Sequence, residues 1–150
     1  GGFPFGACLA TEKAARGMTF ATHGSTYGGN PLAMAAGNAV LDAFEAEDLL
    51  SNVRDKGAKI AARLEQFIGN YPDLFVEVRG KGLLLGIQLT REPRSFVAHL
   101  RDNHGLLTVS GGDNTVRIVP PLVIGDEHVD EFMEKLSAGA ASFQPVAATA

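Results

Sequence analysis

Residues 77–89, EVRGKGLLLGIQL, hold the clearest strand signal in this 150-residue chain. Apolar and charged positions alternate from Val76 to Arg79, as in a strand with one buried face. Glycines then enclose Lys81, and an apolar run follows over residues 83–90. Two strand patterns joined by a glycine-containing turn predict a β-hairpin. Because one face of a hairpin has to be covered, we expect helices to pack on it.

A helical pattern precedes the hairpin at residues 31–44. Asn30 suits the N-cap of this helix, and Pro31 suits its first turn. The apolar positions follow helical spacing: Leu32, Ala35, Ala36, Ala39, Val40, Ala43 and Phe44. This spacing places all of them on one face of an α-helix.

Three more helices and a second hairpin are predicted around the first hairpin. The helices are residues 50–68, residues 95–104 and a last helix capped by Asp126. The second hairpin pairs residues 106–110 with residues 115–119 across a Gly-Gly-Asp-Asn turn. Three basic residues of the first of these helices are expected to face water: Arg54, Lys59 and Arg63.

The sequence divides into three parts. Residues 45–141 form an α+β body, a small and mostly antiparallel sheet covered by helices. Residues 1–44 form an arm in which residues 7–10 suit a buried strand, although the arm offers no neighbour for it. Cys8 in that strand is expected to be a small buried hydrophobe. Residues 142–150 are predicted to be a disordered tail.

Composition excludes several classes of partner. Thirteen Lys and Arg against seventeen Asp and Glu give a net charge of −4 without a basic block, so nucleic acid is not expected. No apolar run is long enough for a membrane span, and the first residues lack a signal-peptide pattern, so we expect a cytoplasmic chain. The single cysteine excludes an intrachain disulfide, and the four histidines lack the spacing of metal ligands.

The stretch ATHGSTYGGNPLA, residues 21–33, sets Ser25 and Thr26 among three glycines. Glycine permits positive φ and close approach of another group, and hydroxyls supply hydrogen bonds. The loop is therefore either a plain connection before the helix or the wall of an anion site. It is not a P-loop, because no Lys-Ser or Lys-Thr pair follows the glycines.

Arg117, in the stretch TVRIVPPL, is a second candidate for a binding role. A guanidinium offers two parallel donors to a carboxylate. A single arginine on a short strand is often only a solvated charge, so both interpretations stay open from the residues alone. Lys81, between two glycines, could suggest an imine-forming lysine but is predicted to lie in an exposed turn.

Four motifs occur in one order and spacing: GGFPFGACLAT at 1–11, HGSTYGGNPLA at 23–33, EVRGKGLLLGIQL at 77–89 and GDNTVRIVPPLVI at 112–124. Together they resemble the C-terminal portion of the class III pyridoxal-phosphate-dependent aminotransferases. Within that family the chain is most similar to the acetylornithine aminotransferases. The resemblance covers nearly the whole chain.

The resemblance implies a fold and a set of site residues. Residues 45–141 would be the C-terminal small domain of a PLP-dependent transferase of fold type I, and residues 1–44 an arm from its large, cofactor-binding domain. The implied cofactor is pyridoxal 5′-phosphate, whose phosphate would accept a hydrogen bond from Thr26 of the partner subunit. Ser25 and Arg117 would contact the substrate, Arg117 at its α-carboxylate.

The resemblance also implies a reaction and a partner. The reaction converts N-acetylornithine and 2-oxoglutarate into N-acetylglutamate 5-semialdehyde and glutamate, in arginine biosynthesis. The partner is a second copy, bound through residues 1–44. In the family the lysine that carries the cofactor lies just before the position of Gly1, so no catalytic residue is expected here and the chain alone is expected to be inactive. Ornithine or another ω-amino acid as substrate, and a non-catalytic dimerisation or binding module, are the alternatives.

Overall fold

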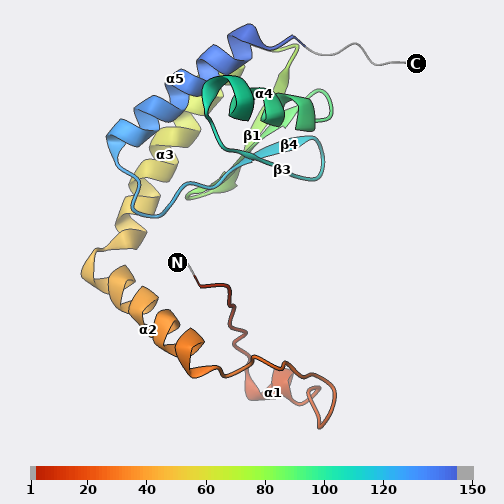
Figure 1. Ribbon diagram of the computed structural model, residues 1–150, viewed down its shortest axis with the longest axis vertical. Coiled ribbons are helices and arrows are strands. Elements are labelled where there is room, and N and C mark those ends of the chain that lie inside the picture. The colour runs from red at the N-terminus through yellow and green to blue at the C-terminus, as the bar shows by residue number, and fades with distance from the viewer. Residues whose placement is uncertain (1–2, 145–150) are drawn as a thin grey trace. The chain divides into compact units, whose positions relative to one another are not determined.

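The computed structural model describes residues 3–144 and confirms the predicted α+β fold class. The chain forms two compact units, Gly1–Asp48 and Leu49–Ala150. The larger unit holds a four-stranded antiparallel sheet with three helices (Figure 1).

The first predicted hairpin forms the edge of the sheet. It consists of β1 (Phe75–Lys81) and β2 (Leu84–Leu89), which pair antiparallel. Lys81 pairs with Leu84, so the chain reverses over the two residues between them. Gly82 in this turn has a φ of +57°, a left-handed conformation that favours glycine.

The second predicted hairpin completes the sheet. Its strands are β3 (Val109–Ser110) and β4 (Thr115–Ile118), and β4 also pairs with β2, which gives the strand order β1-β2-β4-β3. Val116 and Ile118 of β4 are buried, whereas Arg117 between them is exposed. The alternation places Arg117 on the face of the sheet that is turned away from the core.

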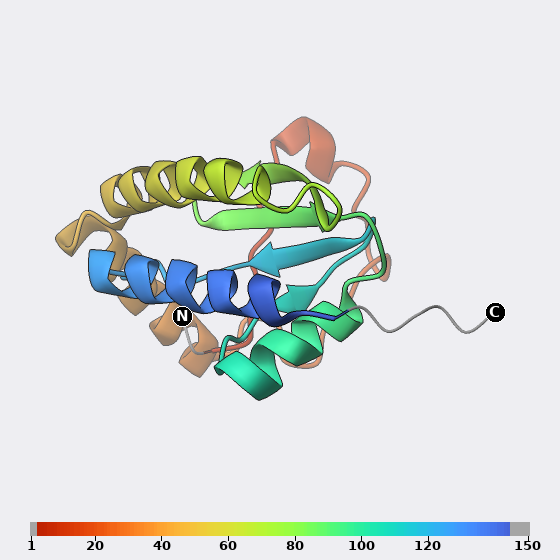
Figure 2. The ribbon, with the colours of Figure 1, turned by 90° about the horizontal axis from the view of Figure 1, so that it is seen from above.

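Helices cover the other face of the sheet. Figure 2 shows α3 (Leu49–Ile68) and α5 (Asp126–Ser142) lying over the strands, while α4 (Arg94–His104) packs against α5. Helices and strands share one apolar core: Ile60, Leu64, Leu85, Ile87, Phe96, Leu100, Val116, Val129 and Leu136. Removal of this apolar surface from water is the main stabilising contribution to the larger unit.

The packing of α3 on the hairpin turn requires a residue without a side chain. A Cβ atom at Gly57 would lie 2.5 Å from the carbonyl oxygen of Gly82. Because a backbone atom stands in the way, the helix could hold no larger residue here without moving. Gly57 therefore sets how closely α3 approaches the sheet.

The start of α5 differs from the prediction by one residue. Gly125 is the N-cap, and Asp126 occupies the first turn. The carboxylate of Asp126 is bound instead by two lysines of α3, Lys56 and Lys59. The Asp126 side chain thus makes a tertiary contact with α3 and does not cap α5.

The end of α5 also differs from the prediction. Ser142 is the last helical residue, and the ring of Phe143 lies edge-on to Phe96 with centroids 5.0 Å apart. The prediction of a disordered tail is therefore wrong for these two residues, because an aromatic side chain there reaches the core. Residues 145–150 of that predicted tail lie outside the described residues.

The smaller unit contains α1 (Glu12–Ala15) and α2 (Pro31–Ala46). Asn30 caps α2 as predicted, since its Oδ1 accepts hydrogen bonds from the backbone N–H groups of residues 32 and 33. Residues 7–10 form no strand, and the prediction that Cys8 is buried is wrong for this chain. The described part of this unit has no second strand with which residues 7–10 could pair.

None of the residues on the predicted apolar face of α2 is buried; some are exposed and the others are half-buried. Leu32 is 66% exposed, and Ala33 is the one buried residue of the helix. One small residue of α2 is covered: a Cβ atom at Gly37 would lie 2.7 Å from Cζ of Phe5. The smaller unit thus leaves much of its apolar surface in contact with water.

Candidate functional site

The predicted anion loop, residues 23–30, is an exposed turn that leads into α2. The Gly28 N–H donates to the carbonyl oxygen of Ser25 at 3.3 Å. Gly29 has a φ of +71°, and the space around its Cβ position is open. Backbone conformation rather than crowding therefore favours glycine at this position. The turn leaves Ser25 and Thr26 exposed at the surface.

The hydroxyl groups of Ser25 and Thr26 are free to bind a ligand. Within residues 3–144 neither hydroxyl makes a hydrogen bond, whereas the hydroxyl of Thr22 donates to the Thr19 carbonyl oxygen at 2.7 Å. Phosphate oxygens are strong acceptors that hydroxyl and backbone N–H donors can satisfy. The donor set of this loop fits a phosphate group.

Strands on both sides hold the backbone of Arg117. It pairs with Gly86 of β2 and with Val109 of β3. Its side chain passes close to Gly111, where a Cβ atom would lie 3.4 Å from Cγ, Cδ and Nε of the arginine. Gly111 thus leaves room for the Arg117 side chain on the outer face of the sheet.

No carboxylate among residues 3–144 pairs with Arg117, since Glu92 in the same depression pairs with Arg94. By contrast, Arg79, in the same row of the sheet as Arg117, lies 3.2 Å from Glu77 and 2.9 Å from Asp113. The depression that Arg117 lines is open and has a volume of about 460 Å³. The other lining residues are Glu92, Arg94, Ser110, Gly111 and Gly112. A guanidinium that is not engaged in an ion pair can bind a carboxylate through two parallel N–H···O hydrogen bonds.

The predicted site residues are distributed over both units. Ser25 and Thr26 share the loop of the smaller unit, and Arg117 belongs to the larger one. Lys81 is exposed at the end of β1, next to the turn in which the sequence places it. Within residues 3–144, no three His, Cys, Asp or Glu side chains are grouped to hold a metal ion. None of the helices in that range is long and apolar enough to cross a bilayer.

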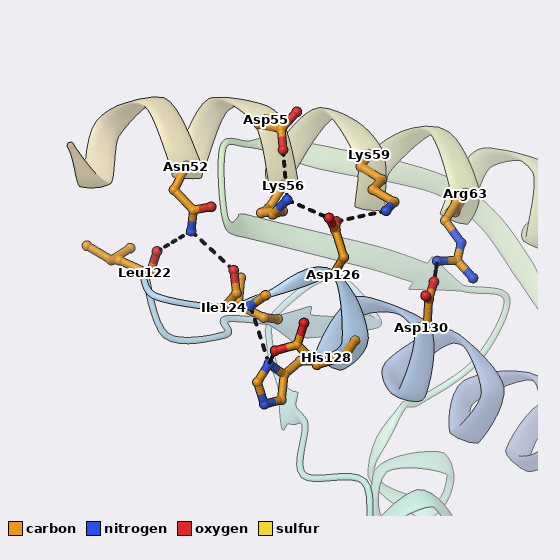
Figure 3. A network of polar contacts seen from close by, with 12 residues as sticks. Asn52, Asp55, Lys56, Lys59, Arg63, Leu122, Ile124, Asp126, His128 and Asp130 are labelled. Carbon is orange, nitrogen blue, oxygen red and sulfur yellow. Dashed lines mark hydrogen bonds and ion pairs between the residues drawn. The ribbon is translucent and has the colours of Figure 1, made fainter. Parts of the chain in front are cut away.

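Asn52 of α3 holds the segment that follows β4, a role that the sequence pattern does not reveal. Its Nδ2 donates to the carbonyl oxygen of Leu122 at 2.8 Å and to that of Ile124 at 3.2 Å (Figure 3). These bonds satisfy two carbonyl groups in the loop between the strand of Arg117 and α5. An asparagine at the edge of an amphipathic helix gave no signal for so distant a contact.

Charged contacts extend this link between α3 and α5 (Figure 3). The Nζ atoms of Lys56 and Lys59 lie 2.9 Å and 2.8 Å from Oδ1 of Asp126. Hydrogen bonds from Lys59 and then Lys56 lower the pKa of Asp126 to about 2. Arg63 pairs in the same way with Asp130. Lys59 is exposed as predicted but also pairs with Asp126, and Arg63 is only half-buried, because this face of α3 borders α5.

A family comparison bears on both candidate groups. Residues 1–139 match the family described as aminotransferase class-III, a stretch that includes the glycine-rich loop and Arg117. The chain belongs to the class III aminotransferases. The resemblance seen in the four motifs is thereby confirmed.

Curated relatives of this chain include acetylornithine aminotransferases. The one from Agrobacterium fabrum is 49% identical over 142 residues, which cover 95% of this chain and 35% of the relative. Acetylornithine aminotransferase 2 from Caulobacter vibrioides is 48% identical over 136 residues, which cover 91% and 33%. The chain thus spans about a third of the length of the curated relatives it matches.

Solved structures of aminotransferases share the fold. Acetylornithine aminotransferase from Elizabethkingia anophelis is 32% identical with a TM-score of 0.77, covering 90% of this chain and 34% of that one. Ornithine delta-aminotransferase from Plasmodium falciparum is 34% identical with a TM-score of 0.78, covering 89% and 34%. The predicted fold class, a part of a PLP-dependent transferase with a small antiparallel sheet, is confirmed.

Proposed function

We propose that this chain is the C-terminal part of an enzyme that transfers an amino group between N-acetylornithine and 2-oxoglutarate. The products are N-acetylglutamate 5-semialdehyde and glutamate, in arginine biosynthesis. The names of relatives 44–49% identical to this chain support this substrate. The structural observation that carries the proposal is Arg117, an arginine on the open face of a sheet that has no carboxylate partner among residues 3–144.

Arg117 binds the α-carboxylate that both substrates carry. Each substrate is an amino acid or a keto acid, so one guanidinium can serve both halves of the reaction. Two parallel N–H donors hold a carboxylate in a fixed orientation, which a single ammonium group cannot do. The strands beside Arg117 keep its backbone in place and so limit the loss of conformational entropy on binding.

The cofactor is pyridoxal 5′-phosphate, on which class III aminotransferases depend. When bound, it withdraws electrons from the substrate carbon that carries the amino group. Thr26 donates a hydrogen bond to the cofactor phosphate held by the partner subunit, and Ser25 contacts the substrate. The free hydroxyls of the loop support these roles, because each has a donor to offer.

No lysine of this chain carries the cofactor. Three of the five lysines are in ion pairs, namely Lys56, Lys59 and Lys135. We assign the cofactor-bearing lysine to a part of the enzyme outside this sequence. Incubation of the chain with pyridoxal phosphate, borohydride reduction and peptide mapping should give scattered labelling well below one equivalent. Stoichiometric labelling of one lysine together with transaminase activity would overturn this assignment.

The enzyme acts as a cytoplasmic homodimer. Residues 1–44 belong to its large domain and form the contact with the partner subunit. Residues 45–141 form its small domain. The arm supports this proposal through its exposed apolar side chains, since Leu9, Phe20 and Tyr27 are 98%, 100% and 81% exposed. Apolar surface of this extent is typical of an interface. Hydrogen exchange on the dilute chain tests it: strong protection of residues 20–30 in a monomer would show that the arm needs no partner.

A second candidate substrate is ornithine or another ω-amino acid. The observation in its favour is the likeness to the ornithine aminotransferase from Plasmodium falciparum, with a TM-score of 0.78. A non-catalytic dimerisation or binding module is the alternative of another class.

Substrate profiling of the full-length enzyme separates these candidates. We expect kcat/KM for N-acetylornithine to exceed that for ornithine, with 2-oxoglutarate as acceptor. A preference for ornithine would favour the second substrate. Absence of transamination in a cofactor-loaded full-length protein would favour the binding module.

A further inference from the structure

Two helices of the larger unit end beside each other. His104 is the last residue of α4, and Ser142 is the last residue of α5. Their side chains meet, with 2.9 Å between Nε2 of His104 and Oγ of Ser142. The carboxyl end of a helix carries a partial negative charge, which favours a cation. The last turn of α5, all of which the structure describes, holds no basic residue of its own to offset this charge.

A second imidazole points at the same oxygen. Nε2 of His99, five residues earlier on α4, lies 3.0 Å from Oγ of Ser142, and the centroids of the two rings are 5.1 Å apart. Ser142 is exposed and both histidines are half-buried, so the point at which the two nitrogens converge is accessible from solvent. Imidazole is the commonest metal ligand in proteins, and two ring nitrogens directed at one accessible point can share an ion.

We propose that His99 and His104 bind one Zn²⁺ ion, or a similar divalent transition-metal ion, through their Nε2 atoms. Imidazole nitrogen suits Zn²⁺, Cu²⁺ and Ni²⁺, whereas Mg²⁺ prefers oxygen ligands. A zinc–nitrogen bond is about 2.0–2.1 Å long, shorter than the hydrogen bonds to Ser142. The Ser142 hydroxyl therefore turns away about χ1 when the ion binds, and water fills the remaining coordination positions.

Asn103 can hold the His99 ring in the form that binds a metal. Nδ2 of Asn103 lies 3.1 Å from Nδ1 of His99. When the amide turns over, its Oδ1 accepts a hydrogen bond from a protonated Nδ1, which leaves the lone pair of Nε2 for the ion. Metal-binding histidines usually have such an outer partner on the second ring nitrogen.

The site differs from a closed structural metal site. Residues 3–144 hold no group of three His, Cys, Asp or Glu side chains, so the protein supplies two nitrogens and the ion stays exchangeable. The spacing of the histidines did not indicate the pair, because residues five apart in a helix do not share one face. The proposal does not depend on the proposed substrates, since its readout is metal binding.

Titration calorimetry of the full-length, cofactor-loaded protein with Zn²⁺ tests the proposal. We expect a saturable site, whose Kd rises about tenfold or more in both His99→Asn and His104→Asn, because loss of an outer partner alone costs 10–100-fold. Ser142→Ala removes the competing hydroxyl and should keep or lower the Kd. His128→Asn, at the other end of α5, is the matched control and should leave the Kd unchanged. Asparagine there can still accept the hydrogen bond from the Gly125 N–H.

A protection experiment on the unaltered protein needs no variant and so holds even if a histidine variant fails to fold. Diethylpyrocarbonate acylates free imidazole nitrogens, and peptide mapping reports each histidine separately. Zn²⁺ should slow the acylation of His99 and His104 but not that of His128, and Mg²⁺ at the same concentration should slow none of them. Acylation of His99 and His104 that Zn²⁺ leaves unchanged, or an unchanged Kd in both histidine variants, would each overturn the proposal.

Discussion

Arg117 on β4 stands directly opposite Gly86 on β2, so its cross-strand partner has no side chain that could cover the guanidinium. On the other side of Gly86 the paired residue is Arg79, which Glu77 and Asp113 neutralise. One row across the sheet therefore carries two arginines separated by a glycine, of which Arg79 is paired and Arg117 has no carboxylate partner within residues 3–144. This difference allows the function of Arg117 to be tested against a matched neighbour.

Replacement of Arg117 in the full-length enzyme should weaken the use of both substrates and leave the cofactor bound. Arg117→Lys keeps the charge but loses the two-pronged geometry, and Arg117→Ala removes both. Loss of a charge-assisted pair is worth on the order of 2–5 kcal/mol where the partner charge stays buried. We therefore expect a large fall in kcat/KM for the alanine variant, measured by steady-state kinetics, with cofactor content followed by absorbance.

Arg79→Ala is the matched control for this experiment. Its ion pairs are exposed to solvent, so its loss should cost at most about 1 kcal/mol of stability and should not change kinetics. Kinetics equal to those of the unaltered enzyme in both Arg117 variants would instead identify Arg117 as a solvated surface charge.

Gly57→Ala should destabilise the larger unit although it places a better helix former within a helix. Alanine in a helix interior is usually favoured over glycine by about 1 kcal/mol. Here the new Cβ atom would meet the Gly82 carbonyl oxygen at 2.5 Å. We expect overpacking to lower the free energy of unfolding by about 1–3 kcal/mol, measured by urea denaturation.

Gly37→Ala on α2 is the control for Gly57→Ala. The new Cβ atom there would meet Cζ of Phe5, whose exposed side chain can swing away about χ1, so the variant should be neutral or stabilising. A stabilising effect of Gly57→Ala as well would mean that α3 can move from the turn without cost.

The ion pairs of Asp126 should make stability depend on pH in the acid range. Its pKa is about 2 in the folded chain and 3.8 as the ordinary value, so the unfolded chain takes up this proton first. The stabilising contribution is therefore fully present above about pH 5 and is lost as the pH falls through 4 toward 2. The difference in free energy of unfolding between the unaltered chain and Asp126→Asn should shrink over that range.

Urea unfolding at several pH values between 2 and 6 measures this difference. The double variant Lys56→Met, Lys59→Met should lose the same pH dependence, because these two ammonium groups hold the carboxylate. If the free energies of unfolding of the unaltered chain and of Asp126→Asn differ by the same amount at every pH from 2 to 6, the assigned role of the lysines is wrong.

The sequence predicted those elements that neighbouring residues determine. Asn30 can cap α2 because the N–H groups that donate to its Oδ1 belong to residues only two and three positions further along the chain. The glycines around Lys81 likewise permit the hairpin turn without any contact to distant residues. The pairing of Lys59 with Asp126 spans 67 residues, and no local pattern distinguishes such a lysine from one in water. Sequence periodicity identified the polar face of α3 but not the second helix beside it.

For the candidate site, too, the sequence revealed what residue types and motifs determine but not what contacts between distant residues determine. Residue types and the family motifs identified Ser25, Thr26 and Arg117 as candidates. The sequence left open whether Arg117 is only a solvated charge, and it could not show that Glu77 and Asp113 pair with Arg79 in the folded sheet.

Thr26→Val in the full-length enzyme should weaken cofactor binding. Valine keeps the shape of threonine but removes the donor, so one phosphate oxygen loses its partner. A hydrogen bond to a charged group is worth about 1.5–3 kcal/mol, so cofactor affinity should fall roughly ten- to one-hundred-fold. Thr22→Val is the control, because the Thr22 hydroxyl is already bonded to the Thr19 carbonyl oxygen. It should leave the affinity unchanged.

The loss at Thr26 should act on the partner subunit, and mixed dimers can show this. Thr26→Val subunits with an intact cofactor-bearing lysine are combined with subunits that lack the lysine but keep Thr26. Each mixed dimer then has one site that joins an intact lysine to a threonine from across the interface. That site should bind the cofactor with nearly normal affinity, measured by equilibrium dialysis after subunit exchange has been verified by mass. A hydroxyl supplied by the partner subunit restores affinity only if it reaches the cofactor phosphate. Weak binding in verified mixed dimers would therefore mean that Thr26 serves the site of its own subunit or no site.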